Sequence, residues 1–156
     1  MRDAAVAVRS LPRRFGEILN GPADDDAWDR LVRTADSSGR SAAGWAAQTT
    51  ALVTALGTAI AALSVTARPT VELAKIVSAR SEPLQAATIA TVLHQLSDVA
   101  GSAATAIEGL HSDFDRKCVV DGTEITAEAL ITRVVESAVA NLHHGEAALD
   151  AARAAH

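Results

Sequence analysis

The chain has 156 residues, a formal net charge of −5 and one cysteine, and 49% of its residues are hydrophobic although only 3% are aromatic. This length suits one domain with a single core, and a core made of Ala, Leu, Val and Ile favours packed helices over a β-sandwich. The acidic balance argues against nucleic acid as the main partner, and the lone Cys118 excludes an internal disulfide and the usual thiolate zinc motifs.

Two amphipathic helices are predicted in the first part of the chain. Over residues 4–19, apolar side chains recur at intervals of three and four, and Pro12 either opens a helix capped by Ser10 or kinks a longer one. Over residues 24–35, the triplet Asp24-Asp25-Asp26 places negative charge where the positive end of the helix dipole favours it. We interpret this triplet as helix capping rather than as a set of metal ligands.

An uncharged stretch over residues 41–67 is the segment around which the other elements are arranged. It lies between Arg40 and Arg68, and its larger apolar side chains recur at helical intervals while Ala and Gly fill most of the other faces. A helix that is apolar nearly all round lies inside a bundle or a membrane. Its five threonines, Gln48 and few large aliphatic residues favour a bundle helix, capped by Ser41, over a membrane span.

Two more long helices and a connection complete the predicted fold. Residues 70–79 form a short helical patch in the connection, and residues 83–111 carry the most regular apolar rhythm of the chain. A short extended piece over residues 118–120 leads to a turn at Asp121-Gly122, and the last helix occupies residues 125–154. Four long helices with a long crossover between the second and the third predict an all-α four-helix bundle.

Three short motifs in these helices carry a resemblance. The run GRSAAGWAAQ over residues 39–48 opens the uncharged helix, Leu11-Pro12-Arg13-Arg14-Phe15 lies in the first helix, and Arg133-Val134-Val135-Glu136 lies in the last. Together they resemble the DinB-like superfamily, which includes the mycothiol-dependent maleylpyruvate isomerases. In that family a Gly-x-Trp-Ser motif opens the second helix and an Arg-x-x-Glu precedes the last metal ligand.

The resemblance implies a long-crossover bundle that holds a divalent metal such as zinc or nickel and uses a low-molecular-weight thiol as co-substrate. Carried over by motif, the first ligand histidine of the family falls on Gln48, its glutamate on Glu136 and its last histidine on Ala140. One carboxylate and one amide do not make a tight site for an ion that prefers imidazole, thiolate or carboxylate ligands. We therefore expect a degenerate metal site.

Histidines further along the chain offer a shifted metal site. His143 lies seven residues beyond Glu136, about 10 Å along a straight helix, which is too far for the two to share one ion. A shifted site would use His143 with Glu146, which lie on one face, and a group from another helix; Glu108 and His111 form a similar pair. The alternative is that His143 is a solvated residue that the helix dipole favours.

Cys118 is the remaining reactive residue type. Arg116 and Lys117 beside it would lower the pKa of its thiol. No sequence feature places a base next to it, so we do not assign it as a nucleophile.

Two functions stay open from the sequence. The first is a DinB-like bundle without catalysis, which binds a small ligand in a polar pocket formed by Gln48, Arg133 and Glu136, or which has a structural or interaction role. The second is a metal- and thiol-dependent transferase or isomerase with an altered ligand set. We expect one domain over residues 1–156, a reducing cytoplasm, a homodimer, and neither nucleic acid nor membrane as a partner.

Overall fold

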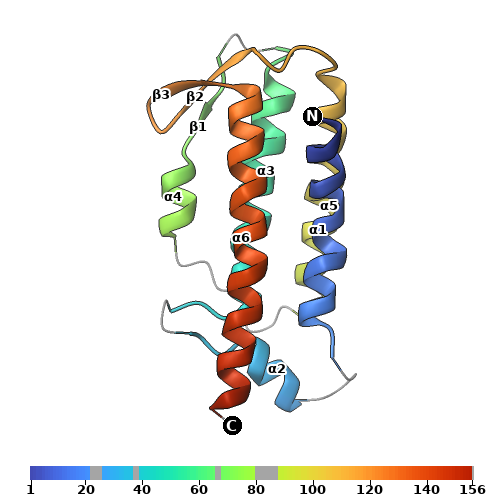
Figure 1. The fold of residues 1–156 in the computed structure, drawn as a ribbon, viewed down its shortest axis with the longest axis vertical. Helices are drawn as coiled ribbons and strands as arrows, with labels where there is room; N and C mark the ends of the chain where they lie inside the picture. Colours follow the sequence, from blue (N-terminus) through green and yellow to red (C-terminus); the bar gives the residue numbers. More distant parts are fainter. Residues whose placement is uncertain (22–25, 37–38, 66–67, 80–87, 156) are drawn as a thin grey trace.

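Four long helices lie side by side in the computed structural model, which describes residues 1–21, 26–36, 39–65, 68–79 and 88–155 (Figure 1). They are α1 (Arg2–Leu19), α3 (Ala42–Ala62), α5 (Ile89–Gly109) and α6 (Ala127–Ala154), and the shorter helices are α2 (Asp26–Val32) and α4 (Leu73–Ser78). The helical class expected from the sequence is confirmed. The predicted beginnings of the helices over residues 24–35 and 83–111 lie outside the described residues.

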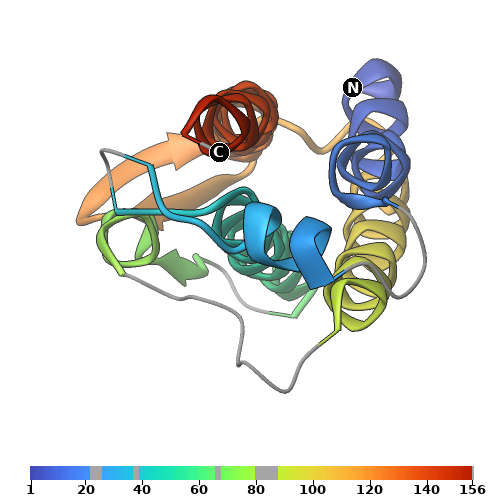
Figure 2. The ribbon, with the colours of Figure 1, turned by 90° about the horizontal axis from the view of Figure 1, so that it is seen from below.

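The second and third long helices, α3 and α5, run in the same direction, opposite to α1 and α6 (Figure 1). A parallel pair needs a connection that returns along the bundle, and β1 (Thr70–Val71) and α4 make up the described part of it. Viewed along the helices, α3 lies between the other elements and packs against both α5 and α6 (Figure 2). This connection lies between the second and third long helices, where the sequence analysis expects a crossover.

A small sheet, which the sequence analysis predicted only in part, lies beside the bundle near the beginning of α6 (Figure 1). Strands β2 (Lys117–Val120) and β3 (Thr123–Thr126) form an antiparallel hairpin, and β1 pairs with β2 in parallel. Asp121 and Gly122 in the hairpin turn have φ angles of 52° and 81°, the pair of positive values that a type I′ turn requires. The extended piece predicted over residues 118–120 is confirmed.

Two predicted helix boundaries near the sheet are wrong. Residues 70–79 do not form one helix, because Thr70 and Val71 pair with Val119 and Val120 before α4 begins. The last helix begins at Ala127 rather than at residue 125, since β3 continues to Thr126. The hydroxyl of Thr126 then accepts a hydrogen bond from the Ala129 N–H at 3.0 Å and caps α6.

The cap of α3 and the course of α1 decide two further predictions. The predicted cap at Ser41 is confirmed, because its hydroxyl accepts a hydrogen bond from the Gly44 N–H at 3.0 Å. In the first helix the longer alternative holds, with Pro12 inside α1, and the Ser10 hydroxyl donates to the Ala7 carbonyl instead of capping. Leu63 to Val65 form a turn beyond α3, which ends earlier than predicted.

The small residues of α3 let neighbouring helices approach closely. Gly57 lies against α5, where a Cβ atom would meet the Cα and Cβ atoms of Ala103 at 3.3 Å. Trp45, Leu52, Leu56 and Ile60 are all buried in the same helix. Its apolar character is thus explained by burial inside the bundle. Among the described residues, none of the helices combines the length and the apolar character that a membrane crossing needs.

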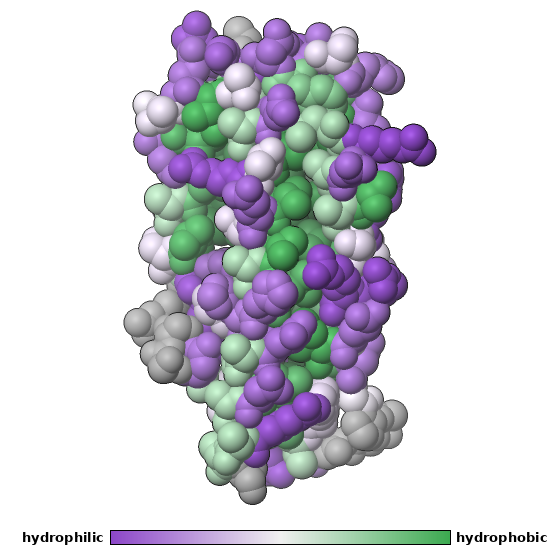
Figure 3. All heavy atoms as spheres, viewed as in Figure 1, coloured by the Kyte–Doolittle hydropathy of each residue, from purple (hydrophilic) through white to green (hydrophobic). Residues whose placement is uncertain are grey.

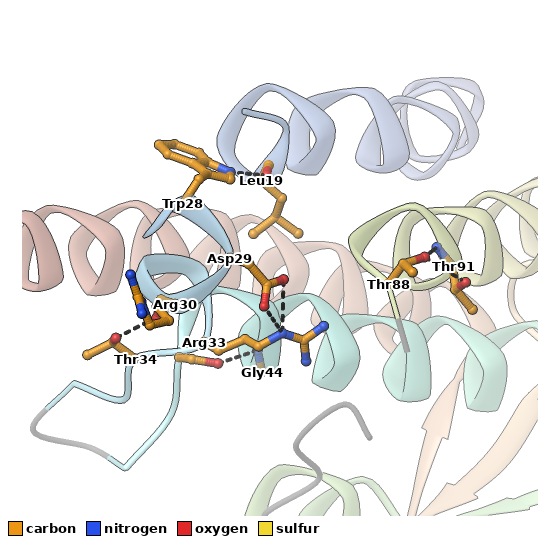
Figure 4. A network of polar contacts seen from close by, with 10 residues as sticks. Leu19, Trp28, Asp29, Arg30, Arg33, Thr34, Gly44, Thr88 and Thr91 are labelled. Atoms are coloured by element: carbon orange, nitrogen blue, oxygen red, sulfur yellow. Dashed lines mark hydrogen bonds and ion pairs between the residues drawn. The ribbon is translucent and has the colours of Figure 1, made fainter. Parts of the chain in front are cut away.

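The short helix α2 is held at the end of the bundle by a polar contact with α1. The Trp28 indole N–H donates to the Leu19 carbonyl at 2.7 Å, and Arg33 pairs with Asp29 one turn before it (Figure 4). On the face drawn in Figure 3, polar side chains cover much of the helix surfaces, and apolar atoms show between them. Among the described residues, the large apolar side chains that stay exposed are Val6, Val65 and Val77.

Candidate functional site

A buried polar cluster joins α3 to α6 in the middle of the apolar core. Asn141 on α6 donates through Nδ2 to Gln48 Oε1 at 3.0 Å and to Thr49 Oγ1 at 3.1 Å. Gln48 and Asn141 are each only 4% exposed, and Thr49 is fully buried. Burying amide groups is favourable only when they are hydrogen-bonded, and this cluster meets that condition with protein groups alone. We call these three residues the Gln48 cluster.

The Gln48 cluster also holds the crossover helix α4. Gln48 Nε2 donates to the Val77 carbonyl at 3.1 Å, and the Arg40 guanidinium donates to the carbonyls of Val77 and Ala79 at 2.7 and 2.9 Å. These carbonyls lie in the last turn of α4, where the helix itself supplies no donor. At the other end of α4, the Asp121 carboxylate accepts a hydrogen bond from the Ala74 N–H at 3.1 Å. Both ends of α4 are thus tied to the bundle.

A cavity of about 320 Å³ lies between α4, α3 and α6, next to the Gln48 cluster; we call it the α4 cavity. Its walls are mainly apolar, with hydroxyl and charged groups at a few points. The lining residues are Leu52, Leu73, Ala74, Val77, Ser78, Asp121, Arg133, Val134 and Ser137. Small-molecule sites have this size and this mixture of apolar walls with a few polar groups.

Arg133 is the positively charged side chain in the lining of the α4 cavity. It is exposed, and in the described part of the chain no hydrogen bond or ion pair engages its guanidinium. The one carboxylate of the lining, Asp121, is occupied by the Ala74 N–H. A ligand that accepts hydrogen bonds therefore finds an available donor at Arg133, while its body contacts Leu73, Val77 and Val134.

Glu136 does not face the interior of the bundle, contrary to the interpretation of the motif. Val134, Ala138 and Asn141 are buried on α6, whereas Glu136 and Ala140 are exposed. A helix turns by 100° per residue, so these two positions lie on a different face from Asn141. The residue that meets Gln48 is Asn141, which the sequence analysis missed although its spacing from Val134 and Ala138 follows the buried rhythm.

The residues that the motif assigns to a metal do not fit a divalent ion. Both ends of the Gln48 amide are engaged by Asn141 and Val77, and the remaining groups of the cluster are an amide and a hydroxyl, which are poor zinc ligands. His143 and Glu146, the shifted pair, are both exposed on α6. In the described ranges, no three His, Cys, Asp or Glu side chains lie close enough together to hold an ion.

His144 lies at the contact between α6 and α3. The His144 ring stacks on Trp45 with 4.6 Å between ring centroids, and the Arg40 guanidinium lies 4.9 Å from the centre of the Trp45 ring. Glu108 does not pair with His111 for metal binding, since its carboxylate forms an ion pair with Arg9 of α1. Both arrangements use the side chains for contacts between elements.

Cys118 is inert rather than activated. It is fully buried in β2, and its S–H group donates to the Ile125 carbonyl at 3.6 Å. Burial raises the pKa of the Cys118 thiol, so the expectation that Arg116 and Lys117 lower it is wrong. Desolvation of the thiolate outweighs the two neighbouring charges, which are carried by the half-buried Arg116 and the exposed Lys117.

Comparisons with protein-family models, with curated proteins and with solved structures found no match to this chain. The resemblance to the DinB-like superfamily is therefore carried by the motifs of the sequence alone.

Proposed function

We propose that this chain is a DinB-like helical bundle whose metal site has been replaced by a structural polar cluster, and that it binds a small organic molecule without catalysing a reaction on it. The observation that carries the proposal is the state of Gln48. At the position where the resembling family keeps its first ligand histidine, this chain has an amide whose two ends are satisfied by Asn141 and by the Val77 carbonyl.

The α4 cavity supplies the ligand site of this proposal. It shares Val77 with the surroundings of the Gln48 cluster, so the place where a ligand binds lies beside the place where the family holds its ion. Of the pocket residues predicted from the sequence, Arg133 lines the cavity, Gln48 supports its wall, and Glu136 is not among the lining residues. A compact ligand with one hydrogen-bond acceptor directed at Arg133 suits this lining.

The alternative, a metal- and thiol-dependent transferase or isomerase, stays a prediction. It would need Gln48 to leave its partners, or His143 and Glu146 to recruit a ligand from another helix. Elemental mass spectrometry on the purified protein, with and without dialysis against a chelator, decides between the two functions. Stoichiometric zinc or nickel would overturn our proposal, whereas a metal-free protein that still binds a ligand in the α4 cavity would support it.

Ligand binding is tested by screening a library of small organic fragments against isotope-labelled protein and following backbone amide shifts. We expect hits that move the amides of Leu73, Val77 and Ser137. The variant Ser137→Leu places a larger side chain in the cavity and should abolish those hits, because Ser137 is a half-buried lining residue with free space before it.

Ser102→Leu is the matched control, since it makes the same change at an exposed position of α5. It should leave the hits unchanged. A screen in which no fragment shifts the cavity residues, or in which Ser137→Leu and the control behave alike, would contradict the proposal.

A further inference from the structure

A second cavity, of about 460 Å³, lies between the beginning of α1 and the end of α5, away from the α4 cavity. We call it the α1–α5 cavity. The two helices are antiparallel, which brings these two ends together (Figure 1). Its lining consists of Met1, Arg2, Ala5, Val6, Arg9, Ile107, Glu108, His111 and Phe114. None of these residues takes part in the proposed function described above.

The charged groups of the α1–α5 cavity have the opposite balance from the whole chain. The protein carries a formal charge of −5, but this lining has two arginines and one glutamate. The glutamate is already neutralised, because Glu108 forms an ion pair with Arg9. Arg2 is exposed, and its guanidinium has no ion pair or hydrogen bond with any residue that the structure describes. One positive charge is therefore available to a ligand.

Arg9 is held in place from across the cavity. Its guanidinium bonds to Glu108 and also donates through Nη2 to the Thr105 hydroxyl at 3.4 Å, so two contacts from α5 orient it. A guanidinium has five N–H donors, and these contacts leave others for a further acceptor. Arg2 and Arg9 thus provide an unpaired and a paired guanidinium on the same helix, seven residues apart and on the same face.

Apolar groups cover the rest of the lining. Val6 is 60% exposed, one of the few large hydrophobic side chains in the described chain that remain so open to water. Phe114 is half-buried, and Ile107 forms the buried floor. A ligand body that covered Val6 and Phe114 would remove apolar surface from water, which is favourable in proportion to the area removed.

The backbone of His111, which also lines the α1–α5 cavity, has an unusual conformation. It directly follows the C-cap of α5 and has a φ of 54°, in the left-handed region where helices usually place Gly or Asn. A side chain at that position is unfavourable, because its Cβ atom crowds the following carbonyl oxygen. His111 lines the cavity, and residues with a strained backbone cluster at sites that bind ligands.

From these observations we propose that the α1–α5 cavity binds a small amphiphilic organic anion, whose charged head is held by Arg2 and Arg9 and whose short apolar body lies on Val6, Ile107 and Phe114. The two arginines favour an anionic ligand over an uncharged one. The apolar side chains favour an anion with an apolar tail over a simple inorganic anion. This site is independent of the α4 cavity.

The test uses hexanoate as the probe, with hexan-1-ol as the uncharged tail and acetate as the head without a tail. Amide shifts of the full-length protein are followed in low salt. We expect hexanoate to move the amides of Arg2, Val6, Ile107 and Phe114, and to bind at least threefold more tightly than either partial probe. Raising the ionic strength should weaken hexanoate but not hexan-1-ol, because salt screens exposed charges.

Two variants with matched controls locate the site. Arg2→Gln should weaken hexanoate about two- to fivefold, as expected for one charged contact at an exposed site. Arg13→Gln, on the exposed part of the same helix, should not. Val6→Ser should weaken hexanoate and hexan-1-ol alike, whereas Val65→Ser, at another exposed valine, should affect neither. Both test positions are exposed, so the fold should tolerate the changes.

Several results would overturn this inference while leaving the α4 cavity untouched. They are equal binding of hexanoate and hexan-1-ol, wild-type affinity in Arg2→Gln, and shifts confined to Leu73, Val77 and Ser137. The last result would instead place the anion in the α4 cavity. In the same way, failure of the fragment screen at the α4 cavity would not change the outcome expected here.

Discussion

Removing the amide of Asn141 tests whether the Gln48 cluster is a structural unit. Asn141→Ala deletes two buried hydrogen bonds, to Gln48 Oε1 and to Thr49 Oγ1. Each neutral hydrogen bond contributes about 0.5–1.5 kcal/mol, and a buried acceptor left without a donor costs about 1–3 kcal/mol. The Thr49 hydroxyl still makes one hydrogen bond, because it donates to the Trp45 carbonyl, whereas Gln48 Oε1 is left with no partner among the described residues. We expect a loss of about 2–4 kcal/mol.

A double-mutant cycle with Gln48→Met isolates the interaction. Gln48→Met alone should cost less, about 1–2 kcal/mol, because the Val77 carbonyl still accepts from Arg40 and Asn141 still donates to Thr49. In the double variant no orphaned acceptor remains, so its cost should fall below the sum of the single costs by about 1 kcal/mol.

The assay is urea unfolding at neutral pH, followed by circular dichroism. Gln95→Met is the matched control, since Gln95 is exposed on α5, and it should change the free energy of unfolding by less than about 0.5 kcal/mol. A cost for Asn141→Ala below that of the control, or additive single costs, would show that the two amides are not coupled and would remove the basis of the proposed function.

Three further predictions concern other parts of the fold. Because burial raises the pKa of the Cys118 thiol, the unfolded chain ionises first as the pH rises above about 8.5, so the wild type should lose stability there relative to Cys118→Ala by up to about 1.4 kcal/mol per pH unit in paired urea titrations. Gly57→Leu should cost about 1–3 kcal/mol in thermal and urea unfolding, since its side chain meets Ala103, whereas Gly101→Leu, with free space around it, should stabilise the protein. His111→Gly should raise the free energy of unfolding by about 1 kcal/mol and weaken hexanoate, and a variant that is less stable than the wild type would contradict the strain assigned to that residue.

The sequence predicted the helices well where local chemistry determines them. The uncharged stretch after Ser41 is buried because its neighbours enclose it, and the Ser41 hydroxyl caps α3 as predicted. The strands β1 and β3 were harder to foresee. Thr70 pairs with Val119 through the fold rather than along the chain, and a two-residue strand leaves no periodic pattern.

The candidate site was predicted in part. Gln48 is buried as expected and Arg133 lines a cavity, but Glu136 points away from both. The motif matched Glu136 by its position in the sequence, but it does not tell which face of the helix the residue lies on. The buried face of α6 contains Val134, Ala138 and Asn141. Counting that face residue by residue would have placed Asn141 opposite α3 and Glu136 in solvent.

The pair formed by Gln48 and Asn141 has a consequence for the alignment of α3 and α6. Ala-rich surfaces are smooth, and a slip of one helix along the other by one turn, about 5.4 Å, would change the apolar contacts rather little. The same slip would bring Ala138 or Gly145 opposite Gln48, and the side-chain amides of Gln48 and Asn141 would be buried without their mutual hydrogen bond. The hydrogen bonds between Gln48 and Asn141 therefore favour one register of α3 against α6, although the apolar contacts alone favour none strongly. Specifying register is the best attested role of a buried polar pair.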